Sequence, residues 1–161
     1  MCSQAIAVRV AEPADADAAI QVVRNSITRL CGADHRNQPN LLAGWLENKT
    51  AENFCTWIGN PDNYCVVAEQ GELCGVGLLH RMGEVRLLYV SPQMQGIGVG
   101  RALMHRLEEH ARKWNLAKVQ LSSTAAARAF YSAIGYRDLG ETDSWRGILC
   151  YKFEKKLIAG G

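Results

Sequence analysis

The sequence has little net charge and no long apolar segment. Its 18 Lys and Arg residues and 16 Asp and Glu residues leave a net charge of +2. A charge this small does not favour nucleic acid or an anionic membrane surface as a partner. No apolar run is long enough to cross a bilayer, and residues 1–10 lack the basic and apolar regions of a secretory signal. We therefore expect a soluble cytoplasmic protein that binds neither nucleic acid nor membrane.

Paired cysteines are also lacking. The six cysteines are spread from position 2 to position 150 without a C-x-x-C pair. In a chain without a secretory signal, this pattern predicts reduced thiols rather than disulfides. The nearest approach to a metal motif is Cys31 with Asp34 and His35. A structural zinc site needs four ligands and no second pair is evident, so we expect no bound metal.

The apolar residues are arranged in a regular order of strands and helices within one domain, residues 1–161. Residues 33–49 are polar, with enough apolar residues near Leu41 for one or two helical turns. A full helix separates the strand at 85–90 from the strand at 118–121, so these two are expected to be parallel. The predicted strands are 6–10, 64–69, 73–81, 85–90, 118–121, 136–139 and 148–153, and the predicted helices are 13–30, 50–58, 99–114 and 125–134.

A glycine-rich segment connects the strand at 85–90 to the following helix. Gly96, Gly98 and Gly100 alternate with other residues, and Gln95 precedes them. The first N–H groups of a helix have no partner within the helix, and the helix dipole adds partial positive charge there. Glycine leaves room for a bulky phosphate to reach these donors. The segment therefore predicts a binding site for a diphosphate.

Two common phosphate motifs do not fit this segment. A dinucleotide fold has G-x-G-x-x-G after its first strand and an acidic residue about twenty positions later. Here the spacing is G-x-G-x-G, the strand is not the first, and Gln120 and Leu121 occupy the later positions. A Walker loop requires Lys and then Ser or Thr after its last glycine, whereas Arg101 and Ala102 follow Gly100.

The segment instead resembles the Q/R-x-x-G-x-G/A signature of the GNAT superfamily of acetyl-CoA-dependent N-acetyltransferases, through Gln95, Gly98 and Gly100. The run 90–92 is similar to that family's strand end, and Phe130-Tyr131 with Gly135-Tyr136 is similar to its F-Y-x-x-x-G-F/Y segment. The likeness covers about residues 73–139, the expected acetyl-CoA-binding core. Residues 33–62 resemble the family only in layout and are the expected acceptor-side helices.

The resemblance implies an α/β fold with a mixed, mostly antiparallel sheet, flanked by helices and opened by a splayed parallel strand pair. Acetyl-CoA would lie in that opening, with its pyrophosphate over the glycine loop. Arg101 is a weaker candidate, for the 3′-phosphate of the cofactor. The residues expected to contact coenzyme A are Leu88, Tyr89, Val90, Gln95, Gly96, Ile97, Gly98, Val99, Gly100, Arg101, Thr124 and Tyr131.

Three residues are candidates for acid–base chemistry. The resemblance implies that Tyr131 protonates the departing thiolate, while Phe130 points into the core; the alternative is that Tyr131 is a packing aromatic. A proton acceptor for the amine is sought in Glu84, at the start of the strand before the loop, or in His80 across the hairpin turn. Either one acts directly or through a water, unless both are solvated hairpin residues.

One position departs from the family pattern, and the acceptor site is less defined. Many members carry Asn where this chain has Thr124, which can cap a helix but lacks the donor and acceptor of an amide. His35 and Trp45 are the candidate contacts for the acceptor, with core packing as the alternative for the aromatics.

Together these features predict direct transfer of an acetyl group from acetyl-CoA to a primary amine of a small molecule or protein. Two alternatives stay open, namely a non-catalytic acyl-CoA sensor and a transferase that uses another acyl-CoA or an oxygen acceptor. A homodimer is one candidate oligomeric state, which the sequence does not decide.

Overall fold

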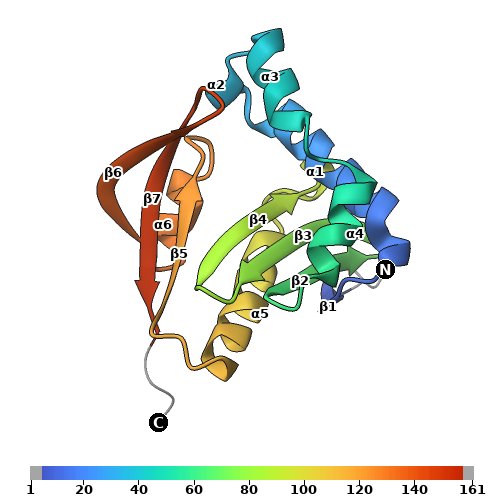
Figure 1. Cartoon of the computed structure of the whole chain (residues 1–161), viewed down its shortest axis with the longest axis vertical. Helices are drawn as coiled ribbons and strands as arrows, with labels where there is room; N and C mark the ends of the chain where they lie inside the picture. Colours follow the sequence, from blue (N-terminus) through green and yellow to red (C-terminus); the bar gives the residue numbers. More distant parts are fainter. Residues whose placement is uncertain (1–4, 158–161) are drawn as a thin grey trace.

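The computed structural model describes residues 5–157, which form a seven-stranded sheet flanked by helices (Figure 1). The strand order is β1-β2-β3-β4-β5-β7-β6, and all neighbours are antiparallel except β4 and β5. This confirms the predicted fold class. The strands are β1 (Ala7–Val10), β2 (Asn63–Gln70), β3 (Glu72–His80), β4 (Glu84–Val90), β5 (Lys118–Ser123), β6 (Arg137–Trp145) and β7 (Ile148–Lys156). The helices are α1 (Ala16–Leu30), α2 (Gly32–His35), α3 (Pro39–Leu46), α4 (Ala51–Gly59), α5 (Val99–Lys113) and α6 (Arg128–Ala133), with short 3-10 turns η1 (Pro13–Asp15) and η2 (Pro92–Met94).

Two hydrophobic clusters lie on opposite faces of the sheet. Helices α1 and α4 cover one face of β1 to β4, and α5 covers the other (Figure 1). Successive residues of a strand point to opposite faces, so Cys65 and Val67 join the α1 cluster whereas Val66 and Ala68 join the α5 cluster. The apolar run in β2 is continuous because both of its faces are buried.

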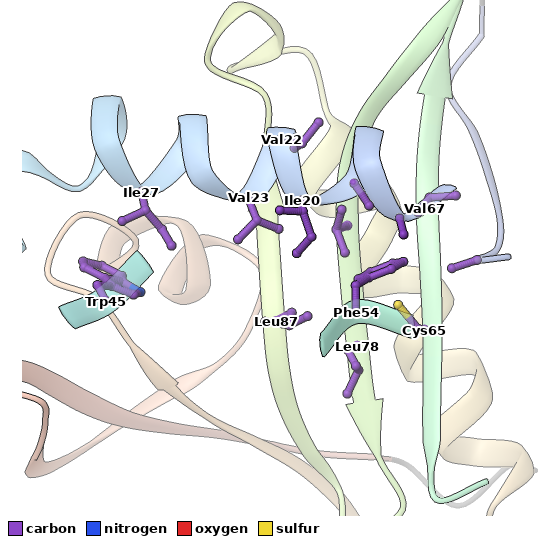
Figure 2. Close-up of a cluster of buried hydrophobic side chains, with 14 of the residues drawn as sticks. Ile20, Val22, Val23, Ile27, Trp45, Phe54, Cys65, Val67, Leu78 and Leu87 are labelled. Atoms are coloured by element: carbon purple, nitrogen blue, oxygen red, sulfur yellow. The ribbon is translucent and has the colours of Figure 1, made fainter. Parts of the chain in front are cut away.

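The cluster under α1 fixes the position of helices α3 and α4. Figure 2 shows Ile20, Val23 and Ile27 on the face of α1 that points toward the strands, with Phe54 from α4 beside them. Trp45 from α3 lies near the Ile27 end of the same cluster and is 4% exposed (Figure 2). These contacts hold α3 against α1.

Helix α5 lies unusually close to β3 because two glycines face it. A β-carbon added to Gly75 would lie 2.8 Å from Val99 Cγ1 and 2.9 Å from Leu103 Cδ1, and one added to Gly77 would lie 3.2 Å from Leu107 Cδ1. Contacts under 3 Å are not tolerated, so a side chain at Gly75 would push the helix away. The two glycines therefore set the distance between the sheet and the start of α5.

Strands β4 and β5 form a fork. Only two residue pairs join them, Glu84 with Gln120 and Val85 with Leu121. Beyond these pairs the strands diverge (Figure 1), while β4 stays paired with β3 as far as Val90. The edge of β4 that faces β5 therefore has backbone groups without a strand partner beyond Val85.

Several predicted segments differ from the observed ones. Helix α6 is shorter than the predicted 125–134 because residues 124–127 form a turn that precedes it. Strands β6 and β7 extend beyond the predicted 136–139 and 148–153, since most of β6 is exposed and shows no apolar alternation. The polar stretch 33–49 contains the end of α2 and the whole of α3, which begins at Pro39, a favoured first helical residue.

Candidate active site

The glycine loop presents unpaired backbone donors at the start of α5. Gly96 has φ 79° and Gly98 has φ 96°, conformations that favour glycine, and Gly98 is the N-cap of the helix. A β-carbon at either position would meet no protein atom within 4 Å. No backbone acceptor in the described part of the chain takes an N–H from residues 95–101. The loop is thus open, positively polarised and suited to an anion.

Gly100 is required for a different reason. A β-carbon there would lie 3.1 Å from Phe130 Cζ. The half-buried ring of Phe130 therefore packs against the first turn of α5 and against the hydrophobic cluster on that face of the sheet. This contact connects the glycine loop to α6, the helix that carries Tyr131.

A cavity of about 560 Å³ extends from the glycine loop into the fork between β4 and β5. The walls are mainly apolar, and of the predicted cofactor contacts only Ile97, whose side chain is 49% exposed, does not line the cavity. The structure thus brings together eleven of the twelve, namely Leu88, Tyr89, Val90, Gln95, Gly96, Gly98, Val99, Gly100, Arg101, Thr124 and Tyr131.

A second cavity of about 460 Å³ also reaches the fork. It is lined by residues from α3, α4, β4 and the β6–β7 hairpin. Five residues line both cavities, which marks the place where they meet: Val85, Arg86, Tyr89, Ser122 and Thr124. A group held in the fork is therefore within reach of a molecule in the second cavity.

Tyr131 lies in the wall of the first cavity with its hydroxyl unpaired. Its residue is 6% exposed, and its ring packs against Phe130, Tyr136 and Phe153. No hydrogen bond to its side chain occurs within the described residues. Burial is the main cause that raises the pKa of Tyr131 above its ordinary value, so the phenol stays protonated at neutral pH.

Tyr89 lies at the junction of the two cavities. The predicted acceptor contact Trp45 lines the second cavity, as Tyr89 does. Burial raises the pKa of Tyr89, and the neighbouring Trp45 side chain opposes that rise. Sequence reasoning assigned Tyr89 only to the cofactor, because nothing along the chain shows that a strand residue borders both cavities.

The two candidate bases are in different places. Glu84 lines the second cavity, and its Oε1 accepts a hydrogen bond from Arg86 Nε at 2.9 Å. His80 lines neither cavity, and its Nδ1 accepts from the backbone N–H of Met82 at 3.0 Å. Of the two candidates, the structure thus brings only Glu84 to the second cavity.

His35 is packed inside the protein rather than facing a cavity. It is fully buried and lines neither cavity. Its Nδ1 accepts from the backbone N–H of Asn37 at 3.1 Å, so its Nε2 carries the proton and donates to the carbonyl of Ile27 at 3.1 Å. With both ring nitrogens occupied by backbone groups, His35 has no free polar atom with which to bind the substrate that accepts the acetyl group.

The thiols near the fork are protonated. Cys31 lines the first cavity and Cys150 lines the second. The sequence predicted neither of these two placements. Burial raises the pKa of Cys31 to about 12 and also raises that of Cys150. Because the thiolate is the nucleophile, neither residue is suited to attack a thioester at neutral pH.

Asp34, which the sequence placed in a weak metal pattern, binds the backbone at the start of the α6 segment. Its Oδ1 accepts from Ala125 N at 2.6 Å and its Oδ2 from Ala126 N at 3.3 Å, although 91 residues separate the partners. The carboxylate is 8% exposed. It joins α2 to the turn that carries Thr124 and leads to Tyr131.

Replacing Asp34 with Asn is expected to destabilise this turn. The amide nitrogen that replaces one carboxylate oxygen is a donor and cannot accept an N–H, so one of the two hydrogen bonds is lost, and hydrogen bonds to charged groups contribute about 1.5–3 kcal/mol. We expect a loss of about 1–2 kcal/mol in the free energy of unfolding, or about 2–6 °C in Tm, measured by thermal denaturation. Asp62→Asn, at an exposed pair with Arg81, is the control that should change Tm little; equal losses in the two variants would contradict the prediction.

Lys49 is a buried cation in the wall of the second cavity. It is 5% exposed, and its Nζ donates to the Trp45 carbonyl at 3.2 Å and to Asn48 Oδ1. Burial, and secondarily the charge of Arg146, lowers the pKa of Lys49 to about 8. Sequence reasoning missed it because a lysine in a polar stretch is ordinarily solvated.

This burial predicts a rise in stability with pH. The unfolded chain keeps the Lys49 proton to about pH 10.5, whereas the folded protein releases it near pH 8. Unfolding then takes up a proton between these values, so the free energy of unfolding should increase by up to about 3 kcal/mol, at 1.36 kcal/mol per unit. Denaturant titrations from pH 7.5 to 9.5 should show about 2 kcal/mol of this rise in the wild type and none of it in Lys49→Met; parallel profiles would contradict the prediction.

Other features narrow the class of protein. Among residues 5–157, no three His, Cys, Asp or Glu side chains are grouped to hold a metal ion. Within the same residues, no helix is both long and apolar enough for a membrane span. A sheet opened at a parallel pair, with an anion-binding loop at one end of the opening, defines a class of proteins that hold an extended phosphate-bearing ligand between two strands.

Comparison with known sequences identifies the family. Residues 34–157 match the family described as an acetyltransferase (GNAT) domain. The chain is 30% identical over 142 residues to mycothiol acetyltransferase of Streptomyces griseus subsp. griseus. That alignment covers 83% of this chain but 43% of the relative, so the chain spans less than half of that protein's length. The chain belongs to the GNAT acetyltransferase family.

Solved structures share the fold. A GCN5-related N-acetyltransferase from Rhodopseudomonas palustris matches with a TM-score of 0.84 at 23% identity, covering 98% of this chain and 99% of the other. The PaiA N-acetyltransferase from Thermoplasma acidophilum, solved in complex with coenzyme A, matches with a TM-score of 0.81 at 20% identity, covering 95% of this chain and 99% of the other. Both likenesses extend along nearly the whole chain.

Proposed function

We propose that this protein transfers an acetyl group from acetyl-CoA to a primary amine by direct attack. The observation that carries the proposal is the open glycine loop, from which one cavity runs into the fork and meets a second cavity at the junction. Membership of the GNAT family and the coenzyme A held by the Thermoplasma relative support the same ligand.

The residues of the first cavity would hold the acetyl-CoA. The unpaired N–H groups of the glycine loop would bind its pyrophosphate, and the free edge of β4 beyond Val85 would lie along its pantetheine arm. The thioester would then reach the junction beside Tyr89. Thr124, in the opposite wall, already accepts a hydrogen bond from Ala127 N at 3.2 Å, so its hydroxyl keeps its own O–H and one lone pair for a ligand.

The chemistry needs a neutral amine, a stabilised oxyanion and a proton for the leaving thiolate. The amine nitrogen attacks the thioester carbon, backbone N–H groups of β4 stabilise the oxyanion, and the carbon–sulfur bond breaks. Tyr131 donates a hydrogen bond or its proton to the sulfur, and Glu84 accepts the amine's proton through a water. The protonated thiols Cys31 and Cys150 favour this direct route over an acyl-enzyme.

Thiol release measured with purified protein tests the proposal. Acetyl-CoA is incubated with a panel of primary amines, and free coenzyme A and acetylated amine are quantified together. Equal amounts of both products support the proposal. Binding of coenzyme A without transfer to any amine would instead indicate a non-catalytic acyl-CoA sensor, and transfer from succinyl-CoA but not acetyl-CoA would indicate a different acyl donor.

The placement of Glu84 and His80 gives a further prediction. Glu84→Gln should lower kcat by about 10- to 100-fold across pH 6–9, because the variant lacks the proton acceptor on the cavity wall. His80→Ala should leave the rate within about 2-fold, since His80 lines neither cavity. Comparing the pH profiles of both variants with the wild type decides between them, and the opposite ranking would assign the base to His80.

A further inference from the structure

The second cavity contains two charged groups without a partner of opposite sign. Four ionisable residues on its wall are relevant, Lys49, Glu84, Arg86 and Asp143. Glu84 and Arg86 form an ion pair with each other at 2.9 Å. Among the described residues, neither Lys49 nor Asp143 makes an ion pair. One positive and one negative charge are therefore left for a ligand.

The cation is held in place by the turn between α3 and α4. The carbonyls of Leu46 and Lys49 both accept hydrogen bonds from Arg24 Nη1, at 2.9 and 3.1 Å. The Lys49 ammonium donates to the Trp45 carbonyl and to Asn48 Oδ1 and lies 4.8 Å from the centre of the Trp145 ring. An ammonium has three donors, so one remains for an acceptor in the cavity.

Burying such a cation without a counter-ion is unfavourable, which the lowered pKa of Lys49 reflects. The carboxylate of Glu47 does not serve as the counter-ion, because it pairs with the nearby cation Arg146 at 2.8 Å. An anionic group in the cavity would supply the missing partner. Because a single ammonium is unpaired, a carboxylate of one negative charge matches it better than a phosphate of two.

The anion and the apolar surface lie in other parts of the same wall. Asp143 is exposed on β6, and its Oδ1 accepts only from the backbone N–H of Ser144, at 2.7 Å. It can attract the ammonium form of an incoming amine. Trp45, Trp57 and Trp145 also line the cavity and provide apolar surface for the body of the ligand.

We propose that the acceptor is an amino acid or a closely similar small molecule, in which a primary amine and a carboxylate are bonded to the carbon that carries an apolar side chain. Lys49 binds its carboxylate and Asp143 attracts its ammonium group before that group loses its proton and attacks. This inference rests on the proposed function, since it names the substrate class of the same site.

Matched pairs of amino acid and decarboxylated amine test the role of Lys49. Phenylalanine is compared with 2-phenylethylamine, leucine with 3-methylbutylamine and tryptophan with tryptamine, by thiol release at pH 7. The wild type should prefer the amino acid by at least about 10-fold in kcat/KM. Lys49→Met should remove that preference by lowering kcat/KM for the amino acid about 10- to 100-fold, while the amine changes less than about 3-fold. Lys113→Met, exposed on α5, is the matched control and should change neither.

Asp143→Asn tests the other end of the ligand. Both members of each pair carry an ammonium group, so KM should rise for both by a similar factor. Unchanged KM values would overturn the assignment of Asp143. Equal use of both members by the wild type, or equal loss for both in Lys49→Met, would overturn the assignment of Lys49. A phosphonate analogue of phenylalanine preferred over phenylalanine would overturn the choice of carboxylate.

A binding measurement separates this inference from the proposed function. Calorimetry with 3-phenylpropanoate, in the presence of coenzyme A, needs no acetyl transfer. Uptake by the wild type but not by Lys49→Met supports the carboxylate site even if no amine is acetylated, in which case only the proposed function fails. Absence of uptake, or equal uptake by both proteins, overturns the inference, whereas transfer to amines without a carboxylate would leave the proposed function intact.

Discussion

Replacing Gly98 with alanine is expected to weaken coenzyme A binding by about 100-fold. The residue has φ 96° at the N-cap of α5, so a side chain would disfavour the conformation that directs the loop N–H groups outward. Its added methyl group would also project into the space where no protein atom lies within 4 Å and where the phosphates are proposed to bind. Losing one or two hydrogen bonds to a charged group, at about 1.5–3 kcal/mol each, gives an effect of this size. Isothermal calorimetry with coenzyme A measures it.

Gly140 provides a matched control for backbone strain. It has φ 72° in β6, and a β-carbon there would also meet nothing within 4 Å, but it lines neither cavity. Gly98→Ala and Gly140→Ala should therefore lower Tm by similar amounts, while only Gly98→Ala changes the Kd of coenzyme A. A Gly98→Ala protein that binds as tightly as the wild type would contradict the assignment of the loop.

Replacing Tyr131 with phenylalanine is expected to lower kcat by about 100-fold with less than about 3-fold change in KM for acetyl-CoA. A positioned acid contributes about 10²- to 10⁴-fold, and the lower end is expected here. A free phenol titrates near 10 and a thiol near 8.5, so full proton transfer to the thiolate is uphill by roughly 2 kcal/mol. Burial raises the pKa of Tyr131 further, which favours a hydrogen bond to the sulfur over complete transfer. Steady-state kinetics with an amine that the protein acetylates measures both constants.

The neighbouring Tyr136 separates catalysis from packing. Its hydroxyl donates to Glu108 Oε2 at 2.9 Å in a buried site, whereas the Tyr131 hydroxyl has no hydrogen-bond partner within residues 5–157. Tyr136→Phe should lower Tm and leave kcat nearly unchanged. Tyr131→Phe should leave Tm nearly unchanged and lower kcat. If Tyr131→Phe kept full turnover, Tyr131 would be only a packing residue.

The parts of the fold that local patterns determine were predictable from the sequence. The strands of the antiparallel meander and helix α1 follow from apolar periodicity, and the parallel pairing of β4 and β5 follows from the helix between them. The hairpin β6–β7 was underestimated because its exposed residues carry no periodic signal. The start of α6 was misjudged because Asp34, 91 residues before Ala125, binds the preceding turn.

The candidate site also has one part that local sequence patterns predict and another that only the fold assembles. The glycine loop is a local feature, so its conformation could be inferred from Gly96 and Gly98 alone. The second cavity is assembled from segments that are distant along the chain, and Lys49 and Asp143 meet the same space only after folding. His35 and Trp45 were equal candidates in sequence, but buried backbone partners occupy His35 while Trp45 reaches the cavity wall. Which side of a helix faces a cavity is decided by tertiary packing.

The fork between β4 and β5 has a consequence for how much of the protein persists in a cell. Only two residue pairs join these neighbouring strands, so a molecule bound between them would hold the two halves of the sheet together. Binding to the folded form alone adds RT ln(1 + [L]/Kd) to stability, about 2.7 kcal/mol at a hundredfold excess over Kd. The supply of acyl-CoA would then affect the rate at which proteases degrade the protein as well as the reaction rate. A shortage of acyl-CoA would lower the amount of the protein itself.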